Sequence, residues 1–94
     1  MKLSETEKQV IVDKLEEEGA TKVEIFGSYA RNEAGEDSDI DILVEFSDRK
    51  SLVDTARIER ELSRALEIDA DLVTEDSLSP LIAERIENTE VLIA

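Results

Sequence analysis

Hydrophobic and polar residues alternate over positions 39–46, and this period of two predicts a β-strand. One face of the strand is wholly apolar and consists of Ile40, Ile42, Val44 and Phe46. The other face consists of Asp39, Asp41, Leu43 and Glu45. Side chains two positions apart on a strand point the same way, so Asp39 and Asp41 present two carboxylates side by side, away from the core.

Two longer segments have the spacing of amphipathic helices. The first begins with a capping-box pattern, Ser4 followed by Glu7, and runs to about Glu18. The second is predicted to run from a cap at Ser51 to about Glu67. Its buried side is predicted to comprise Leu52, Val53, Ala56, Leu62, Ala65 and Leu66.

Shorter elements complete the pattern. Strands are predicted over 22–26 and 70–74, with a closing strand over 91–94. Residues 29–32 are predicted to begin a short helix, and a last helix is predicted to open at Pro80, near its first turn.

This order of elements predicts one small domain, residues 1–94, of the α/β (α+β) class. We expect a small mixed sheet with helices packed on one face. The other face is expected to stay open around Asp39 and Asp41, where a site would be accessible.

The amino-acid composition excludes several kinds of catalytic and metal site and bears on the binding partners. The chain has no histidine and no cysteine, which excludes histidine-based catalysis, thiolate zinc sites and disulfides.

The net charge of the chain is −14, from 25 acidic and 11 basic residues. Direct DNA or RNA binding is not expected, because nucleic-acid affinity comes mainly from cationic contacts to phosphate. The acidity fits either a salt-rich cytosol or a basic protein partner. A cytoplasmic protein is predicted, since no apolar run resembles a membrane span or a signal peptide.

The candidate chemistry lies where a turn with Gly27 and Ser28 is followed, after ten residues, by Asp39 and Asp41. Two carboxylates on one strand face can share a divalent metal ion, and a Gly-Ser turn can hold a phosphate nearby. A metal beside a phosphate cradle is what transfer from a nucleoside triphosphate needs.

This motif resembles the signature of the nucleotidyltransferases of the DNA polymerase beta superfamily. Over essentially the whole chain, the sequence is most similar to the minimal nucleotidyltransferases (MNT proteins). Asp71, in the segment Asp71-Leu72-Val73-Thr74, matches the family's third-carboxylate strand. The segment 76–86 resembles the family's closing helix.

The resemblance implies a role for each matching residue. Asp39, Asp41 and Asp71 would be the catalytic carboxylates and would bind Mg²⁺, and Asp71 would also accept the nucleophile's proton. Gly27 would let the backbone approach the triphosphate. Ser28 would bind the terminal phosphates, helped by the N-terminus of the following helix.

Two positions beside the motif bear on that turn. Arg31 would touch phosphate, or instead form a surface ion pair with Glu33 or Glu36. Asn32 replaces a glycine that is common in the family, and asparagine tolerates a left-handed backbone, so the turn is expected to persist.

The family also implies an activity and a partner. An MNT protein would be the antitoxin of a HEPN-domain RNase toxin and would transfer AMP from ATP to a tyrosine of that toxin, with which it could form a hetero-oligomer. Two alternatives stay open: a non-catalytic antitoxin that inhibits by binding alone, and nucleotidyl transfer to a small molecule or an RNA end.

Two further features have ordinary structural explanations. Tyr29 is predicted to be an exposed loop aromatic rather than a site of self-modification. Five of the eleven basic residues fall within sixteen positions: Arg49, Lys50, Arg57, Arg60 and Arg64. We favour a solvated helix face paired with Glu59, Glu61 and Glu67 over an RNA or partner patch.

Overall fold

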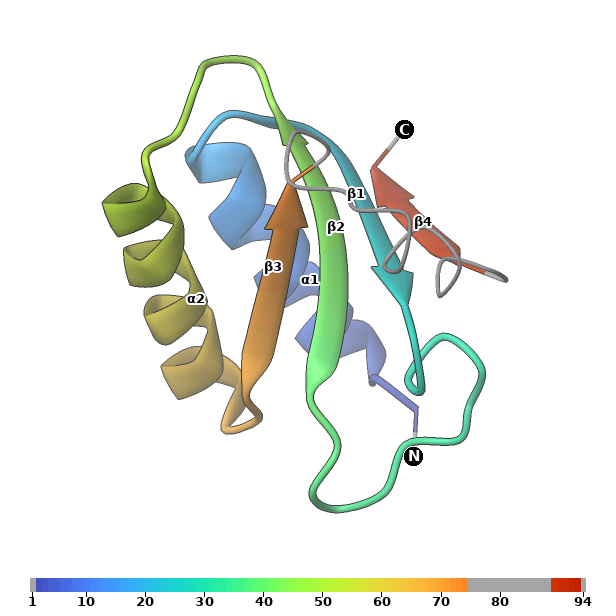
Figure 1. Cartoon of the computed structure of the whole chain (residues 1–94). Helices are drawn as coiled ribbons and strands as arrows, with labels where there is room; N and C mark the ends of the chain where they lie inside the picture. The colour runs from blue at the N-terminus through green and yellow to red at the C-terminus, as the bar shows by residue number, and fades with distance from the viewer. Residues whose placement is uncertain (1, 75–88, 94) are drawn as a thin grey trace.

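Four strands form one mixed sheet in the computed structural model, which describes residues 2–74 and 89–93 (Figure 1). The strands are β1 (Ala20–Phe26), β2 (Ile40–Phe46), β3 (Ala70–Thr74) and β4 (Glu90–Ile93). Their order in the sheet is β3-β2-β1-β4. β1 pairs antiparallel with both β2 and β4, and β2 pairs parallel with β3. The predicted mixed sheet is therefore confirmed.

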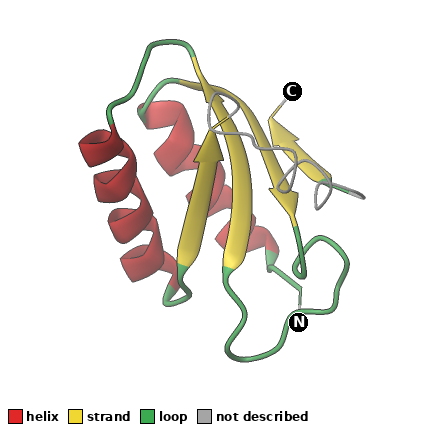
Figure 2. Ribbon diagram, in the orientation of Figure 1, coloured by secondary structure: helices red, strands yellow, loops and turns green. Residues whose placement is uncertain are grey.

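Two helices, α1 (Glu5–Glu17) and α2 (Leu52–Leu66), pack on one side of this sheet (Figure 2). Both begin with a reciprocal capping box, at Ser4 in α1 and at Ser51 in α2, which satisfies N–H groups that a helix start leaves without partners. Among the described residues, no helix is long and apolar enough to cross a membrane.

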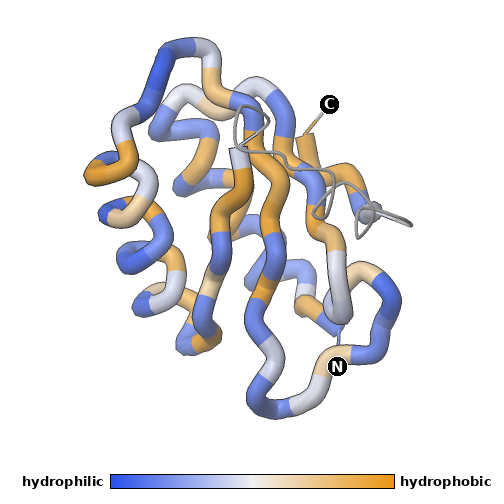
Figure 3. Tube along the Cα trace, viewed as in Figure 1, coloured by the Kyte–Doolittle hydropathy of each residue, from blue (hydrophilic) through white to orange (hydrophobic). Residues whose placement is uncertain are grey.

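The main core lies between the helices and the sheet. It is built from residues of α1 and α2 and from every second residue of the strands, on the face that the two helices cover. Its fully buried members include Ile11, Leu15, Val23, Ile25, Ile40, Ile42, Val44, Ile58 and Leu62. Hydrophobic and hydrophilic residues alternate at the start of β2, as predicted (Figure 3). This packing fixes which face of β2 carries its aspartate.

The opposite face is only partly open. Asp71 and the residue preceding β2, Asp39, are exposed, as expected for an accessible site. A second buried cluster on that face, however, contains Phe26, Leu43 and Val73. The face predicted to be open therefore has its own small apolar core beside the carboxylates.

The predicted helix at 29–32 is wrong, because residues 27–32 form consecutive turns. The strand over 70–74 is confirmed as predicted, and β1 begins two residues before the predicted start, at Ala20. The closing strand is confirmed as β4, Glu90–Ile93. The helix predicted to open at Pro80, within the segment 76–86, lies outside the described residues.

The predicted buried side of α2 is wrong at four of its six residues. The buried residues of α2 are Ile58, Leu62 and Leu66, one helical turn apart on a single stripe, so Leu62 and Leu66 are confirmed and Ile58 was missed. Leu52 and Val53 are 87% and 79% exposed, and Ala56 and Ala65 are also exposed. The stripe through Ile58 faces the sheet.

The buried stripe of α2 predicts that the smaller of two substitutions in this helix costs more stability. Ile58→Val removes one buried methyl group and should cost about 1 kcal/mol of unfolding free energy. Leu52→Ala removes more atoms, yet it should change stability by less than about 0.5 kcal/mol because the side chain is already in water. Urea unfolding of both variants measures the difference. A larger loss for Leu52→Ala would contradict the packing described.

Arg57 links the two helices rather than joining an open basic face. Its guanidinium lies 3.0 Å from Glu18 at the end of α1 and 2.9 Å from Glu61 one turn along α2. Lys14 completes the network, 2.7 Å from Glu61. Hydrogen bonds from Arg57 lower the pKa of Glu18 below its usual value. Of the predicted partners of this arginine, Glu61 is confirmed.

Candidate active site

The register of β2 and β3 brings two of the predicted carboxylates together. Asp41 pairs with Asp71 directly across the parallel ladder. Residues paired in this way sit about 4.8 Å apart along the sheet and point to the same face. Because that face lies opposite the main core, both side chains point to the side of the sheet that α1 and α2, the helices described, do not cover.

Asp39 lies one residue before β2, not on the strand itself. The following residue is anchored, since the N–H of Ile40 donates to the carbonyl oxygen of Asp69 at 2.8 Å. Ile40 is fully buried and Asp39 is exposed, which continues the alternation of the strand by one position. That Asp39 shares the side of Asp41 stays a prediction, because Asp39 lies outside the paired residues of β2.

Gly27 lies directly against the Asp41 carboxylate. A Cβ atom added at this position would collide with Oδ2 of Asp41 and would lie 3.2 Å from its Cγ. The backbone φ of Gly27 is +74°, a left-handed value that side chains disfavour. The first residue of the motif and the second aspartate are thus in contact, although fourteen positions separate them.

The turn after Gly27 is held by its own backbone. Arg31 donates its N–H to the carbonyl of Gly27 at 3.2 Å, and Glu33 donates to Ser28 at 2.8 Å. Asn32 has φ +59°, so the expected left-handed residue is confirmed. Turns rather than a helix follow Ser28, which means that the predicted help from a helix N-terminus is wrong.

Ser28 remains suited to bind an anion without that helix. Its hydroxyl, and the N–H groups of Ser28, Tyr29 and Ala30, donate to no acceptor within residues 2–74 and 89–93. Successive N–H groups in a turn form a concavity that attracts anions. The turn alone therefore supplies the donors that a phosphate cradle needs.

Tyr29 is buried, which corrects the prediction of an exposed aromatic. Its exposed fraction is 7%, and it belongs to the main core with Leu3 and Ala34. Burial raises the pKa of the Tyr29 phenol, and the charges of Glu7 and Asp39 raise it further. The side chain thus anchors the turn to the core and is not presented for modification. In the sequence, the sign of this burial is that Tyr29 is the one aromatic residue of a polar loop.

Arg31 is paired in this structure. Its Nε lies 3.1 Å from Glu33 Oε2, and both side chains are well exposed. This is one of the two roles predicted for it. An exposed pair contributes little to stability, so the guanidinium can exchange this partner for a phosphate at small cost.

Mg²⁺ fits the donors at this site. Among the described residues, no group of three or more carboxylates is already arranged as a metal cage. Mg²⁺ does not require one, because it is usually bound by one or two carboxylates together with substrate phosphates and water. The hard oxygens of Asp41 and Asp71, with Asp39 predicted beside them, supply that set when a triphosphate provides the rest.

Glu59 of α2 is a fourth carboxylate near the site, and it was not among the residues predicted from the sequence. Its Oε2 accepts a hydrogen bond of 2.7 Å from the N–H of Leu72, the residue after Asp71. Burial raises the pKa of Glu59, and the nearby Asp71 carboxylate raises it further. Its place beside Ile58, at the border of the buried stripe, was the signal available.

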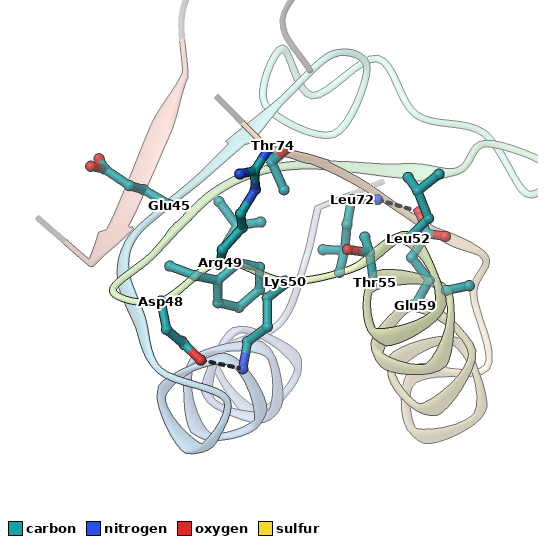
Figure 4. A pocket seen from close by; sticks show the side chains of 12 residues that line it. Glu45, Asp48, Arg49, Lys50, Leu52, Thr55, Glu59, Leu72 and Thr74 are labelled. Atoms are coloured by element: carbon teal, nitrogen blue, oxygen red, sulfur yellow. Dashed lines mark hydrogen bonds and ion pairs between the residues drawn. The ribbon is translucent and has the colours of Figure 1, made fainter. Parts of the chain in front are cut away.

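A cavity of about 520 Å³ lies between the start of α2 and the carboxyl ends of β2 and β3 (Figure 4). Glu59 and Leu72 line it together with Phe46, Lys50, Thr55 and Thr74, whereas none of the residues predicted for the site does. Lys50 sits 5.5 Å from the centre of the Phe46 ring. Asp41 and Asp71 lie near the opposite ends of β2 and β3.

Known proteins share both the sequence and the fold. The pattern of the nucleotidyltransferase domain matches residues 8–93. A Methanocaldococcus jannaschii protein, provisionally named a protein adenylyltransferase, is 48% identical over 84 residues, which cover 89% of this chain and 90% of that protein. Protein adenylyltransferase MntA of Thermococcus cleftensis is 43% identical over 68 residues, 72% of this chain and 69% of that one. A crystal structure described as a toxin-antitoxin with AMP-PNP matches with a TM-score of 0.82 at 26% identity, covering 90% of this chain and 71% of that chain.

Proposed function

This chain belongs to the nucleotidyltransferase domain family, and we propose that it is a magnesium-dependent protein adenylyltransferase that transfers AMP from ATP to a tyrosine of a partner protein. The observation that carries the proposal is the pairing of Asp41 with Asp71, with Gly27 packed against the Asp41 carboxylate. Carboxylate oxygens thus lie next to a turn in which the N–H groups of Ser28, Tyr29 and Ala30 have no acceptor among the described residues, an arrangement that suits a bound triphosphate and its metal ion.

Each residue has a role in the proposed reaction. Asp39, Asp41 and Asp71 would hold Mg²⁺, which when bound stabilises negative charge on the phosphates. Ser28 binds the terminal phosphates through its hydroxyl and the turn. The phenol oxygen of the acceptor forms a bond to the α-phosphorus, while the bond from that phosphorus to the bridging oxygen breaks. Pyrophosphate leaves with the electron pair, and Asp71 accepts the phenol proton.

We place this activity in a toxin–antitoxin pair, with a HEPN-domain RNase toxin as acceptor. Three things support this: the resemblance to MNT proteins, the name of the Thermococcus relative, and the toxin-antitoxin structure that holds AMP-PNP. The presence of all three carboxylates favours catalysis over inhibition by binding alone.

Intact mass of both proteins tests the proposed transfer. The purified chain, ATP and Mg²⁺ are mixed with the product of the adjacent gene, and each protein is weighed. We expect the partner to gain about 329 Da, one AMP unit, or multiples of it, through metal-assisted transfer. A stable complex with no gain would instead indicate inhibition by binding. Neither gain nor complex would direct the search to small-molecule and RNA acceptors.

Mg²⁺ and ATP together should raise the melting temperature of the chain. Asp41 and Asp71 pair across the sheet and both carry negative charge, which a bound cation offsets, and a ligand that binds only the folded state stabilises it. At about 100 times the dissociation constant the gain is about 2.7 kcal/mol, which raises the melting temperature of a domain of this size by about 14 °C. Thermal unfolding measures this shift. An equal rise with ATP in EDTA would contradict a metal-dependent site.

A further inference from the structure

Strand β3 is at the edge of the described sheet, and α2 supplies partners for two of its outward N–H groups. Leu72 donates to Glu59 Oε2 at 2.7 Å, and Ala70 donates to Ser63 Oγ at 2.9 Å. Ser63 is itself fixed, since its hydroxyl donates to the carbonyl oxygen of Glu59 at 2.8 Å. An edge strand normally leaves such groups to water, so these two side chains hold β3 from the side on which the described residues place no strand.

The two anchors differ in what lies next to them. Ser63 is neutral and holds the first residue of β3. Glu59 is partly buried and holds Leu72, the residue after Asp71. Burying a carboxylate is unfavourable for stability, and a neutral acceptor would satisfy the same N–H. That cost suggests a role outside folding.

We propose that Glu59 is a positioning residue for Asp71. It fixes the backbone of β3 at Leu72, and this keeps the Asp71 side chain opposite Asp41. The inference rests on the proposed function, in which Asp71 is the third carboxylate. Within the described sheet, β3 has five residues and pairs on one side only, so the Glu59 hydrogen bond is a large part of what fixes the strand at this point.

Three variants distinguish a role of Glu59 in positioning Asp71 from a general stabilisation of the edge strand β3. Glu59→Gln keeps an oxygen that can accept from Leu72, Glu59→Ala removes it, and Ser63→Ala removes the matched bond to Ala70. Binding of Mg²⁺ with a non-hydrolysable ATP analogue is followed by amide chemical shifts, and hydrogen exchange of the Leu72 amide reports the bond itself. The ratio of kcat to KM for ATP is measured alongside.

We expect Glu59→Ala to expose the Leu72 amide and to weaken Mg²⁺ binding about tenfold or more, as loss of a residue that orients a ligand does. The ratio of kcat to KM for ATP should fall by a similar factor. Glu59→Gln should restore protection and remain within about threefold of the wild type. Ser63→Ala should free the Ala70 amide and leave Mg²⁺ binding unchanged.

The inference is overturned if Glu59→Ala binds Mg²⁺ as the wild type does, or if Ser63→Ala weakens binding equally. It is also overturned if Glu59→Gln protects the Leu72 amide yet binds Mg²⁺ as poorly as Glu59→Ala. The Asp71→Asn variant in the same titration shows whether the positioning role of Glu59 or the assignment of Asp71 to the site is wrong. If Asp71→Asn weakens binding and Glu59→Ala does not, only the positioning role is lost. If Asp71→Asn binds normally, the assignment of Asp71 to the site is wrong.

Discussion

Replacing Asp39 and Asp41 together by asparagine should abolish nucleotidyl transfer while the domain stays folded. Asparagine keeps the shape of each side chain and removes both charges, so the site loses two of the hard anionic oxygens that Mg²⁺ prefers. Without a metal ion to stabilise the phosphates, we expect a loss of at least about 1,000-fold in rate. Intact mass of the partner protein over time measures the rate.

The fold should survive because neither aspartate belongs to the core. Asp39 is exposed, and Asp41 is half-buried and lies across the sheet from the main cluster. A matched control is Glu36→Gln with Asp37→Asn, which makes the same change in net charge on exposed residues of the same loop. The control should transfer AMP normally. Activity that persisted in the Asp39→Asn/Asp41→Asn variant would show that the metal site is elsewhere.

Much of the sheet and the site was predictable because strict patterns specify them. The alternation that begins at Ile40 determines the face of Asp41, and one buried face leaves only one register open to such a strand. The capping-box pattern at Ser4 and the predicted cap at Ser51 identified both helix starts. The left-handed residue Asn32 followed from the chemistry of asparagine in a turn.

The errors arose where tertiary contacts choose between equivalent local patterns. On α2 both Leu52 and Ile58 are apolar, and packing against β3 and α1 selects the second for burial. Tyr29 sits among polar residues, so its burial depends on a core assembled from distant segments. Glu59 is polar and meets Leu72 only after α2 crosses beside the edge strand. In the sequence, its place beside Ile58, at the border of the buried stripe, is the feature that points to that contact.

Gly27→Ala should reduce transfer by about 100-fold and also lower stability. The new Cβ would occupy the space of Asp41 Oδ2, so the carboxylate has to rotate away from its position beside Asp71. A displacement of about 1 Å in a reacting group costs about that factor in rate. In addition, a residue with a side chain at φ +74° is strained by about 1 kcal/mol. Transfer kinetics and urea unfolding measure the two effects separately.

Two other glycines of the chain separate strain from displacement. Gly19 has φ +91° and lies against Ser47 and Asp48, away from the carboxylates, so Gly19→Ala should lower stability and leave transfer intact. A Cβ added at Gly35 would meet no described atom within 4 Å, and Gly35→Ala should change neither property. If Gly19→Ala impaired transfer as much as Gly27→Ala, backbone strain alone would explain the loss. Loss confined to Gly27→Ala would instead trace it to the contact with Asp41, because of these three glycines only Gly27 would place its Cβ on a proposed metal ligand.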